Sequence, residues 1–87
     1  MTASTRQAGH LNALRVRLDW LEVDARFIPI LGELQVEHPD YAGPVWVSAT
    51  ERGAYVMRDG FYRRALCADP HKAARQLVRY FQARLVV

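Results

Sequence analysis

The chain has 87 residues, of which 51% are hydrophobic, and a net charge of +3. A chain of this length has room for one hydrophobic core, so we expect residues 1–87 to form a single small globular domain. No apolar run is long enough to cross a bilayer, and the first residues lack the apolar stretch of a signal peptide. The single cysteine, Cys67, excludes an internal disulfide. Together these features predict a cytoplasmic protein that does not contact a membrane.

Charge is unevenly distributed along the chain. Four arginines and six acidic residues give residues 1–44 a net charge of −2, whereas eight basic and three acidic residues give residues 45–87 a net charge of +5. An anionic partner would therefore contact the C-terminal half. The alternative is that this basic surface is only solvated.

Residues 11–28 fit two patterns of secondary structure. Apolar residues recur at spacings of three and four, as on one side of a helix, at Leu11, Leu14, Leu18, Leu21, Ala25 and Ile28. Read as a strand, the segment alternates apolar and charged residues up to Trp20, but the alternation slips at Leu21. We predict a helix, because the run is long and rich in helix-forming residues. Ser4 or Thr5 would cap its start.

The predicted helix is apolar on a second side as well, which carries Val16, Trp20, Val23 and Phe27. We expect the helix to be sandwiched inside the fold or, as the alternative, to support a homodimer through the Trp20 face. Pro29 ends or restarts the helix, and Asp24 would cap a short second helix. The segment 37–44 contains two prolines and a glycine, which predicts a loop.

Three short strands are expected next, over residues 45–50, 54–58 and 61–67, because these segments are rich in β-forming residues. Residues 51–53 suit a three-residue hairpin loop with Gly53 in the left-handed conformation. The pair Asp59-Gly60 is typical of a two-residue type I′ turn.

The C-terminal segment, residues 68–85, has the clearest helical pattern. Asp69 is placed at its N-cap and Pro70 at the first helical position. Its apolar side includes Phe81, and a basic stripe of Lys72, Arg75 and Arg79 lies on another side. The predicted fold class is thus α+β: one or two N-terminal helices, a three-stranded antiparallel meander and a C-terminal amphipathic helix.

The predicted register divides the meander into two faces. The more apolar face is expected to pack against the C-terminal helix. The other face carries two aromatic residues and two arginines, namely Trp46, Arg58, Phe61 and Arg63. These residue types are enriched at binding hot spots, so we predict a partner-binding surface here. The alternative is that the N-terminal helices cover this face and that the arginines pair with Glu51 or Asp59.

No group of residues forms a catalytic or metal-binding pattern in the sequence. The histidines His10, His38 and His71 fall on separate elements without metal-ligand spacing. The carboxylates of Asp19, Glu22 and Asp24 are expected to pair with neighbouring arginines on the helix. Cys67 is expected to be a buried strand residue. We therefore predict no enzymatic activity, no catalytic residue, no metal and no cofactor.

Two functions remain, and the first is a small non-enzymatic protein-binding module. It would act as an adaptor or inhibitor of a protein or nucleoprotein complex. The hairpin and following helix, over about residues 54–82, resemble the arrangement in some anti-CRISPR proteins, which phages and other mobile elements carry. That resemblance implies an inhibitor that blocks a nucleoprotein complex. We favour this function over the second.

The second function is nucleic-acid binding. The predicted order of helix, three antiparallel strands and helix is similar to that of the double-stranded RNA-binding domain. That family has a basic cluster at the start of its last helix, where residues 71–75 stand in this chain. The resemblance implies phosphate contacts from Lys72, Arg75 and Arg79.

Overall fold

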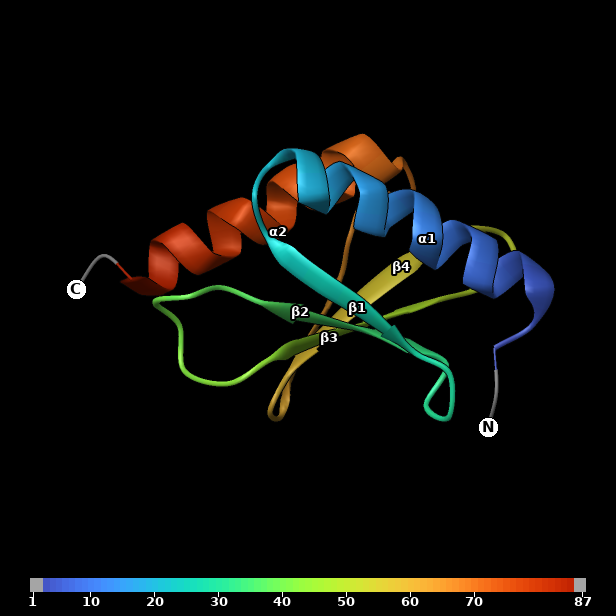
Figure 1. Cartoon of the computed structure of the whole chain (residues 1–87), viewed down its shortest axis with the longest axis horizontal. Coiled ribbons are helices and arrows are strands. Elements are labelled where there is room, and N and C mark those ends of the chain that lie inside the picture. Colours follow the sequence, from blue (N-terminus) through green and yellow to red (C-terminus); the bar gives the residue numbers. More distant parts are fainter. Residues whose placement is uncertain (1–2, 86–87) are drawn as a thin grey trace.

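A five-stranded antiparallel sheet carries two helices on one face (Figure 1). The computed structural model describes residues 3–85. Helix α1 spans Thr5–Trp20, and helix α2 spans Pro70–Leu85. The strands are β1 (Asp24–Ile28), β2 (Glu33–Glu37), β3 (Val45–Ala49), β4 (Tyr55–Asp59) and β5 (Tyr62–Ala65). Each strand pairs with its neighbour in the sequence, so the sheet order is β1-β2-β3-β4-β5.

The α+β class with a helix at each end is as expected, but the predicted three-stranded meander is wrong. Strands β1 and β2 precede the three predicted strands and extend the sheet to five. The order helix, three strands, helix is therefore absent from this fold. The resemblance to the double-stranded RNA-binding domain rested on that order and does not extend to the observed topology.

Helix α1 ends at Trp20 and does not continue to residue 28 as predicted. The Glu22 N–H donates to the Asp19 carbonyl (3.0 Å) and the Val23 N–H donates to the Leu18 carbonyl (2.9 Å), which are the two bonds of a Schellman motif. Glu22 takes the left-handed conformation that this motif requires, with φ of 61°. Glycine usually occupies this position, so no residue type in the sequence marks the helix end.

A β-hairpin takes the place of the predicted second helix. Asp24 begins β1, and Ile28 pairs with Glu33 across the turn that Pro29 opens. Ala25 and Phe27 point to the same side of β1 and pack against the core, as the two-residue period of a strand requires.

Both helix starts agree with the sequence. The Ser4 hydroxyl accepts from the Gln7 N–H (3.2 Å), and the Gln7 side chain accepts from the Ser4 N–H (2.8 Å), which makes a capping box. At the start of α2, the Asp69 carboxylate accepts from the His71 N–H (2.9 Å). Pro70 is the first helical residue, as predicted.

One turn of the meander differs from its prediction. The loop 51–53 is as expected, because the Thr50 N–H donates to the Ala54 carbonyl (2.9 Å). In the next hairpin, however, Asp59 pairs with Tyr62, so the turn is Gly60-Phe61. Only the first of these two residues has a positive φ, which is the pattern of a type II′ turn. Because the register shifts by two residues, the side chains that remain in the strands keep their predicted faces, whereas Phe61 moves into the turn.

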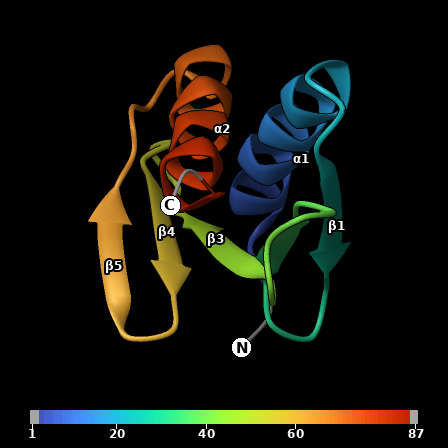
Figure 2. The same ribbon diagram turned by 90° about the vertical axis from the view of Figure 1, so that its left-hand side faces the viewer.

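The core lies between the helices and the inner face of the sheet. Figure 2 shows α1 over the β1–β3 side and α2 over the β4–β5 side of the same face. Buried side chains from all layers meet there, among them Leu11, Leu14, Leu18, Leu34, Val36, Val45, Val47, Tyr55, Met57, Leu77 and Phe81. Among residues 3–85, neither helix has the length and apolar character needed to cross a membrane.

Candidate functional site

One row of side chains crosses the sheet face that carries no helix. Strand pairing places Arg26 opposite Gln35, Gln35 opposite Trp46, Trp46 opposite Arg58, and Arg58 opposite Arg63. Residues that are paired in this way share one face, and the neighbours of these residues in each strand point to the face that carries the helices. We call these five residues the open-face row. Each of them is half-buried or exposed.

Three of the four predicted binding residues, Trp46, Arg58 and Arg63, belong to the open-face row. The fourth, Phe61, projects fully into solvent from the β4–β5 turn. The alternative that helices cover this face is wrong, because both pack on the other face (Figure 2). Sequence reasoning missed Arg26 and Gln35, which it placed outside the sheet. The alternation within residues 24–28 was the available signal.

The open face is close to neutral in charge. Its three arginines are matched by three carboxylates that the register places on the same face, Asp24, Glu33 and Glu37. Arg58 Nη2 lies 3.2 Å from Glu33 Oε1, so Arg58 pairs with neither of the two predicted carboxylates. An exposed ion pair of this kind stabilises a fold by about 0–1 kcal/mol. Its main effect is to orient the guanidinium beside Trp46.

A second surface lies between β5 and α2. Lys72, Arg75 and Arg79 line a hollow of about 300 Å³. Arg79 also lines an adjoining hollow of about 380 Å³, together with Arg64 and Arg84. We call the two hollows together the β5–α2 groove. Five basic side chains and no acidic one are among its lining residues, so the structure brings the predicted basic stripe together with Arg64 and Arg84.

Two tyrosine rings form one end of this groove. Tyr62 of β5 and Tyr80 of α2 are stacked, with ring centroids 5.8 Å apart and planes inclined by 11°. The Arg84 guanidinium lies 4.9 Å from the Tyr80 centroid and 5.8 Å from that of Tyr62, within the range of a cation–π contact. Tyr62 remains 44% exposed.

Asp59 joins three distant segments of the chain. Its Oδ2 accepts hydrogen bonds from the hydroxyls of Tyr41, in the β2–β3 loop, and Tyr80 in α2 (2.6 Å for Tyr80). The hydrogen bond to Asp59, followed by burial, raises the pKa of Tyr41 from 10.0 to about 12. Burial is the larger cause of the raised pKa of Tyr80, and its hydrogen bond to Asp59 is the second.

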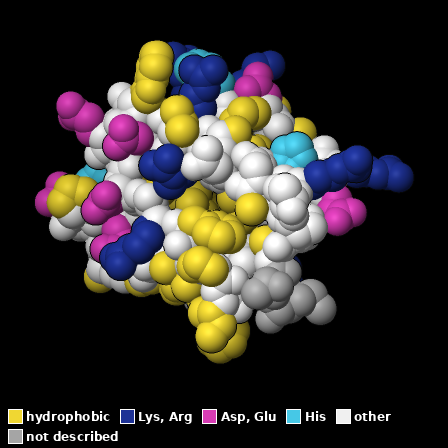
Figure 3. Space-filling view, turned by 45° about the vertical axis from the view of Figure 1, so that its right-hand side comes forward, with side chains coloured by type: hydrophobic (Ala, Val, Ile, Leu, Met, Phe, Trp, Pro, Cys, Tyr) yellow, Lys and Arg dark blue, Asp and Glu magenta, His cyan; other side chains and the backbone are white. Residues whose placement is uncertain are grey.

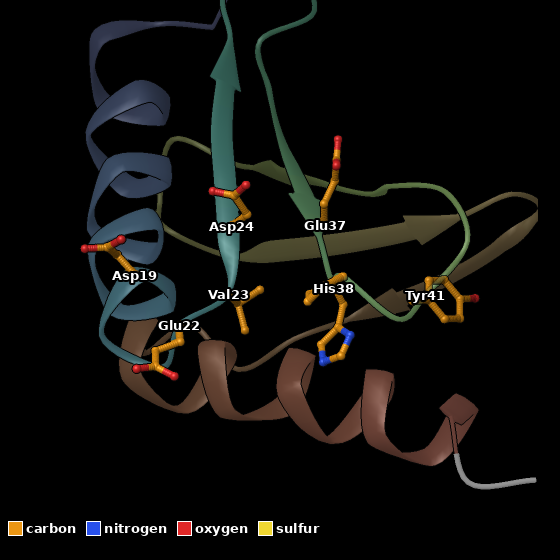
Figure 4. A pocket seen from close by; sticks show the side chains of 8 residues that line it. Asp19, Glu22, Val23, Asp24, Glu37, His38 and Tyr41 are labelled. Atoms are coloured by element: carbon orange, nitrogen blue, oxygen red, sulfur yellow. The ribbon is translucent and has the colours of Figure 1, made fainter.

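A larger hollow, of about 570 Å³, lies where α1 ends and β1 begins. Its lining includes the carboxylates of Asp19, Glu22, Asp24 and Glu37. Figure 4 shows that these carboxylates do not point toward one common centre. Among residues 3–85, no three His, Cys, Asp or Glu side chains are placed to hold a metal ion. The predicted pairing of Asp19, Glu22 and Asp24 with helix arginines is also absent from the described part of the chain, where Arg58–Glu33 is the only ion pair.

The other candidate side chains lie apart from one another. The His10 ring is 3.1 Å from the Glu51 carbonyl oxygen, the His38 ring lies 5.5 Å from that of Phe81, and His71 is exposed in α2. Cys67 is half-buried in the loop after β5 and not in a strand as predicted. These positions bring no two of the named side chains together.

Apolar side chains are exposed at two places outside these surfaces. Val16 and Trp20 on α1 are 39% and 75% exposed, so the predicted sandwiching of this helix is wrong. The homodimer through the Trp20 face stays a prediction. The second place is the β1–β2 turn, where Ile30 and Leu31 are exposed. Figure 3 shows hydrophobic side chains gathered there, and acidic side chains toward the left edge of the view.

Comparison with known proteins leaves these surfaces to be interpreted from their own geometry. The chain matches no protein-family model, no curated protein and no solved structure.

Proposed function

We propose that this protein is a small non-enzymatic protein-binding module that docks its partner on the open-face row. One observation carries the proposal: within residues 3–85, a whole face of the sheet carries no helix, and on the central strand of that face Trp46 lies beside Arg58. Trp and Arg are enriched at the centres of protein interfaces, where a few residues supply most of the binding energy.

The geometry of the row favours binding without large rearrangement. Trp46 is held on the central strand β3, between Gln35 of β2 and Arg58 of β4. The ion pair with Glu33 restrains Arg58 before any partner arrives. Side chains that are already ordered lose less conformational entropy on binding. Trp46 is therefore the proposed anchor, with Arg58 beside it on β4 and Arg63 one strand further on β5.

Phe61 extends this surface beyond the sheet. Its ring is fully exposed at the tip of the β4–β5 hairpin, which leaves a large apolar side chain in water. Burial of an aromatic ring against a partner supplies apolar area and specific ring contacts. We propose that Phe61 contacts the same partner as Trp46.

Charge favours a protein over a nucleic acid on this face. Carboxylates of Asp24, Glu33 and Glu37 would repel a phosphate backbone that crossed the row. A protein surface, which carries both signs of charge, can complement such a mixed face. The partner is therefore proposed to be a protein or the protein part of a nucleoprotein complex. An adaptor and an inhibitor of the anti-CRISPR kind both fall within this proposal, and the cytoplasm is the proposed compartment.

The test compares capture by the wild-type protein with capture by the double variant Arg58→Ala/Arg63→Ala. Nuclease-treated lysate of the source organism is passed over each immobilised protein, and the retained partner is then purified and titrated against both by calorimetry. Loss of these two arginines of the open-face row is expected to weaken binding at least tenfold. The melting temperature should stay within a few degrees, because exposed substitutions change stability little.

The matched control is Arg6→Ala/Arg52→Ala, which removes the same charge from two exposed arginines outside the open face. We expect this variant to bind the partner with wild-type affinity. A partner that binds the Arg58/Arg63 variant as tightly as the wild type would contradict the proposal.

A further inference from the structure

We infer that the β5–α2 groove binds single-stranded nucleic acid, with phosphates on its basic side chains and a base stacked on Tyr62. This site is separate from the open-face row and does not depend on the function proposed for it. The groove lies along the edge strand β5 on the side of the sheet that carries α2.

The first step of the argument is the charge of the groove. Lys72, Arg75 and Arg79 follow one another on α2 at intervals of three and four residues, which places them along one side of the helix. Arg64 faces them from β5. A run of cations along a groove is what a negatively charged strand requires.

Nearby carboxylates leave this charge largely uncompensated. Neither Asp59 nor Asp69 is among the residues that line the groove. The Asp59 carboxylate accepts hydrogen bonds from the hydroxyls of Tyr41 and Tyr80, although its charge still acts on Arg84. The Asp69 carboxylate caps α2 through the His71 N–H. The cations that remain free to meet phosphate are Arg64, Lys72, Arg75 and Arg79.

The second step is the tyrosine stack. One face of the Tyr62 ring packs on Tyr80, and 44% of the Tyr62 side chain remains exposed. A ring supported from behind in this way keeps its orientation, which suits it to accept a base on its free side. Stacking of bases on aromatic rings beside a basic track is the usual way in which proteins bind single strands without reading their sequence.

The tyrosine stack also favours binding of single strands over duplexes. Bases in a duplex are stacked on one another and are not available to a protein ring, so a duplex would use only the cations. An acidic peptide would also use the cations alone. Only an unpaired base would stack on Tyr62. A substitution of Tyr62 should therefore affect the binding of single strands and not that of duplexes or acidic peptides.

The experiment measures fluorescence anisotropy of labelled 12-nucleotide oligothymidylate and oligouridylate at several salt concentrations. Four phosphate contacts predict a slope of log affinity against log salt of about −3, because each contact contributes about −0.7 for a single strand. Affinity should therefore fall roughly 50-fold between 50 and 200 mM salt. Labelled 12-base-pair DNA and RNA duplexes and an oligoglutamate peptide are titrated in parallel, and weaker binding of each is expected.

Two variants test the two parts of the site. Arg75→Gln/Arg79→Gln should make the slope shallower by about 1.4. Arg6→Gln/Arg52→Gln, which removes the same charge outside the groove, should keep the slope. Tyr62→Leu should lower single-strand affinity about fivefold or more and leave duplex affinity unchanged. Phe61→Leu, which removes the neighbouring ring, should leave both unchanged.

Several results would overturn the inference. These are the absence of single-strand binding at 50 mM salt, equal or tighter binding of a duplex or of the peptide, and single-strand affinity that Tyr62→Leu or Arg75→Gln/Arg79→Gln does not alter. Thermal melting of each variant shows that the comparison is made between folded proteins. Because none of the three groove substitutions touches the open-face row, failure here would leave the protein-binding proposal standing.

Discussion

Single residues with left-handed backbone conformations fix two ends of secondary structure in this fold. Glu22 closes helix α1 with φ of 61°, and Gly60 opens the β4–β5 turn with φ of 60°. A side chain in this region costs roughly 1–2 kcal/mol, whereas glycine enters it freely. Glu22 also places a negative charge at the negative end of the helix dipole. The two positions therefore call for opposite substitutions.

Glu22→Gly is expected to raise the free energy of unfolding by about 1 kcal/mol, because it removes both the conformational cost and the unfavourable charge. Gly60→Val is expected to lower it by about 1–2 kcal/mol; no other atom lies within 4 Å of the added Cβ, so its backbone conformation alone sets the cost. Calorimetric melting should show shifts of about 4–8 °C per kcal/mol in opposite directions.

Glu22→Gln separates the two causes at Glu22, since it removes the charge and keeps the side chain. We expect it to recover less than half of the gain of Glu22→Gly. A Glu22→Gly variant that melts below the wild type would show that the left-handed conformation at this position is not a source of strain.

Among the elements, α2 contributes the largest fully buried side chain of the helical layer. Phe81 is fully buried and contacts the rings of Tyr41 and Tyr80 (centroids 5.3 and 6.2 Å). Phe81→Ala is expected to lower the free energy of unfolding by roughly 3–5 kcal/mol. Since domains of this size are stable by only about 5–15 kcal/mol, chemical denaturation should show a variant close to unfolding.

Phe61→Ala is the matched control, because it deletes the same side chain from the solvent-exposed turn. Its free energy of unfolding should stay within about 0.5 kcal/mol of the wild type. If Phe81→Ala is no less stable than Phe61→Ala, the described packing of α2 on the sheet is wrong.

The elements also show how far the sequence could predict this fold. Helix α2 was predictable because Asp69, Pro70 and the apolar spacing agree, and the 51–53 loop because Gly53 marks it. The end of α1 was not, because Glu22 stands where glycine would signal a Schellman motif. A helix predicted to continue to residue 28 leaves no place for strands β1 and β2, although Ala25 and Phe27 alternate with charged residues.

The same error limited what could be predicted of the candidate site. Trp46, Arg58 and Arg63 were placed on one face, because an error of two residues in register does not change the face of a side chain. Arg26 and Gln35 were missed with their strands. Of the β5–α2 groove, the helical spacing predicts only the stripe on α2, since the approach of Arg64 and Tyr62 depends on tertiary packing that no local pattern encodes.

At the scale of the whole molecule, Asp59 holds together segments that are far apart in the sequence. Through Tyr41 and Tyr80 it joins the β2–β3 loop and α2 to the β4–β5 hairpin. The raised pKa of Tyr41, about 12, means that the folded protein keeps this hydroxyl proton to higher pH than the unfolded chain, in which the pKa is near 10. The raised pKa of Tyr80 acts in the same direction.

Because the unfolded chain releases these protons first, the stabilising contribution of the cluster is complete below pH 10 and is lost as the pH rises to about 12. Denaturation at a series of pH values should show this decline in the wild type and a shallower one in Tyr41→Phe, which cannot ionise at this position. Tyr62→Phe is the control, as its hydroxyl makes no hydrogen bond to Asp59, and it should keep the wild-type slope. Equal slopes for wild type and Tyr41→Phe would show that Asp59 does not hold the Tyr41 proton and that the β2–β3 loop is joined to the β4–β5 hairpin by packing alone.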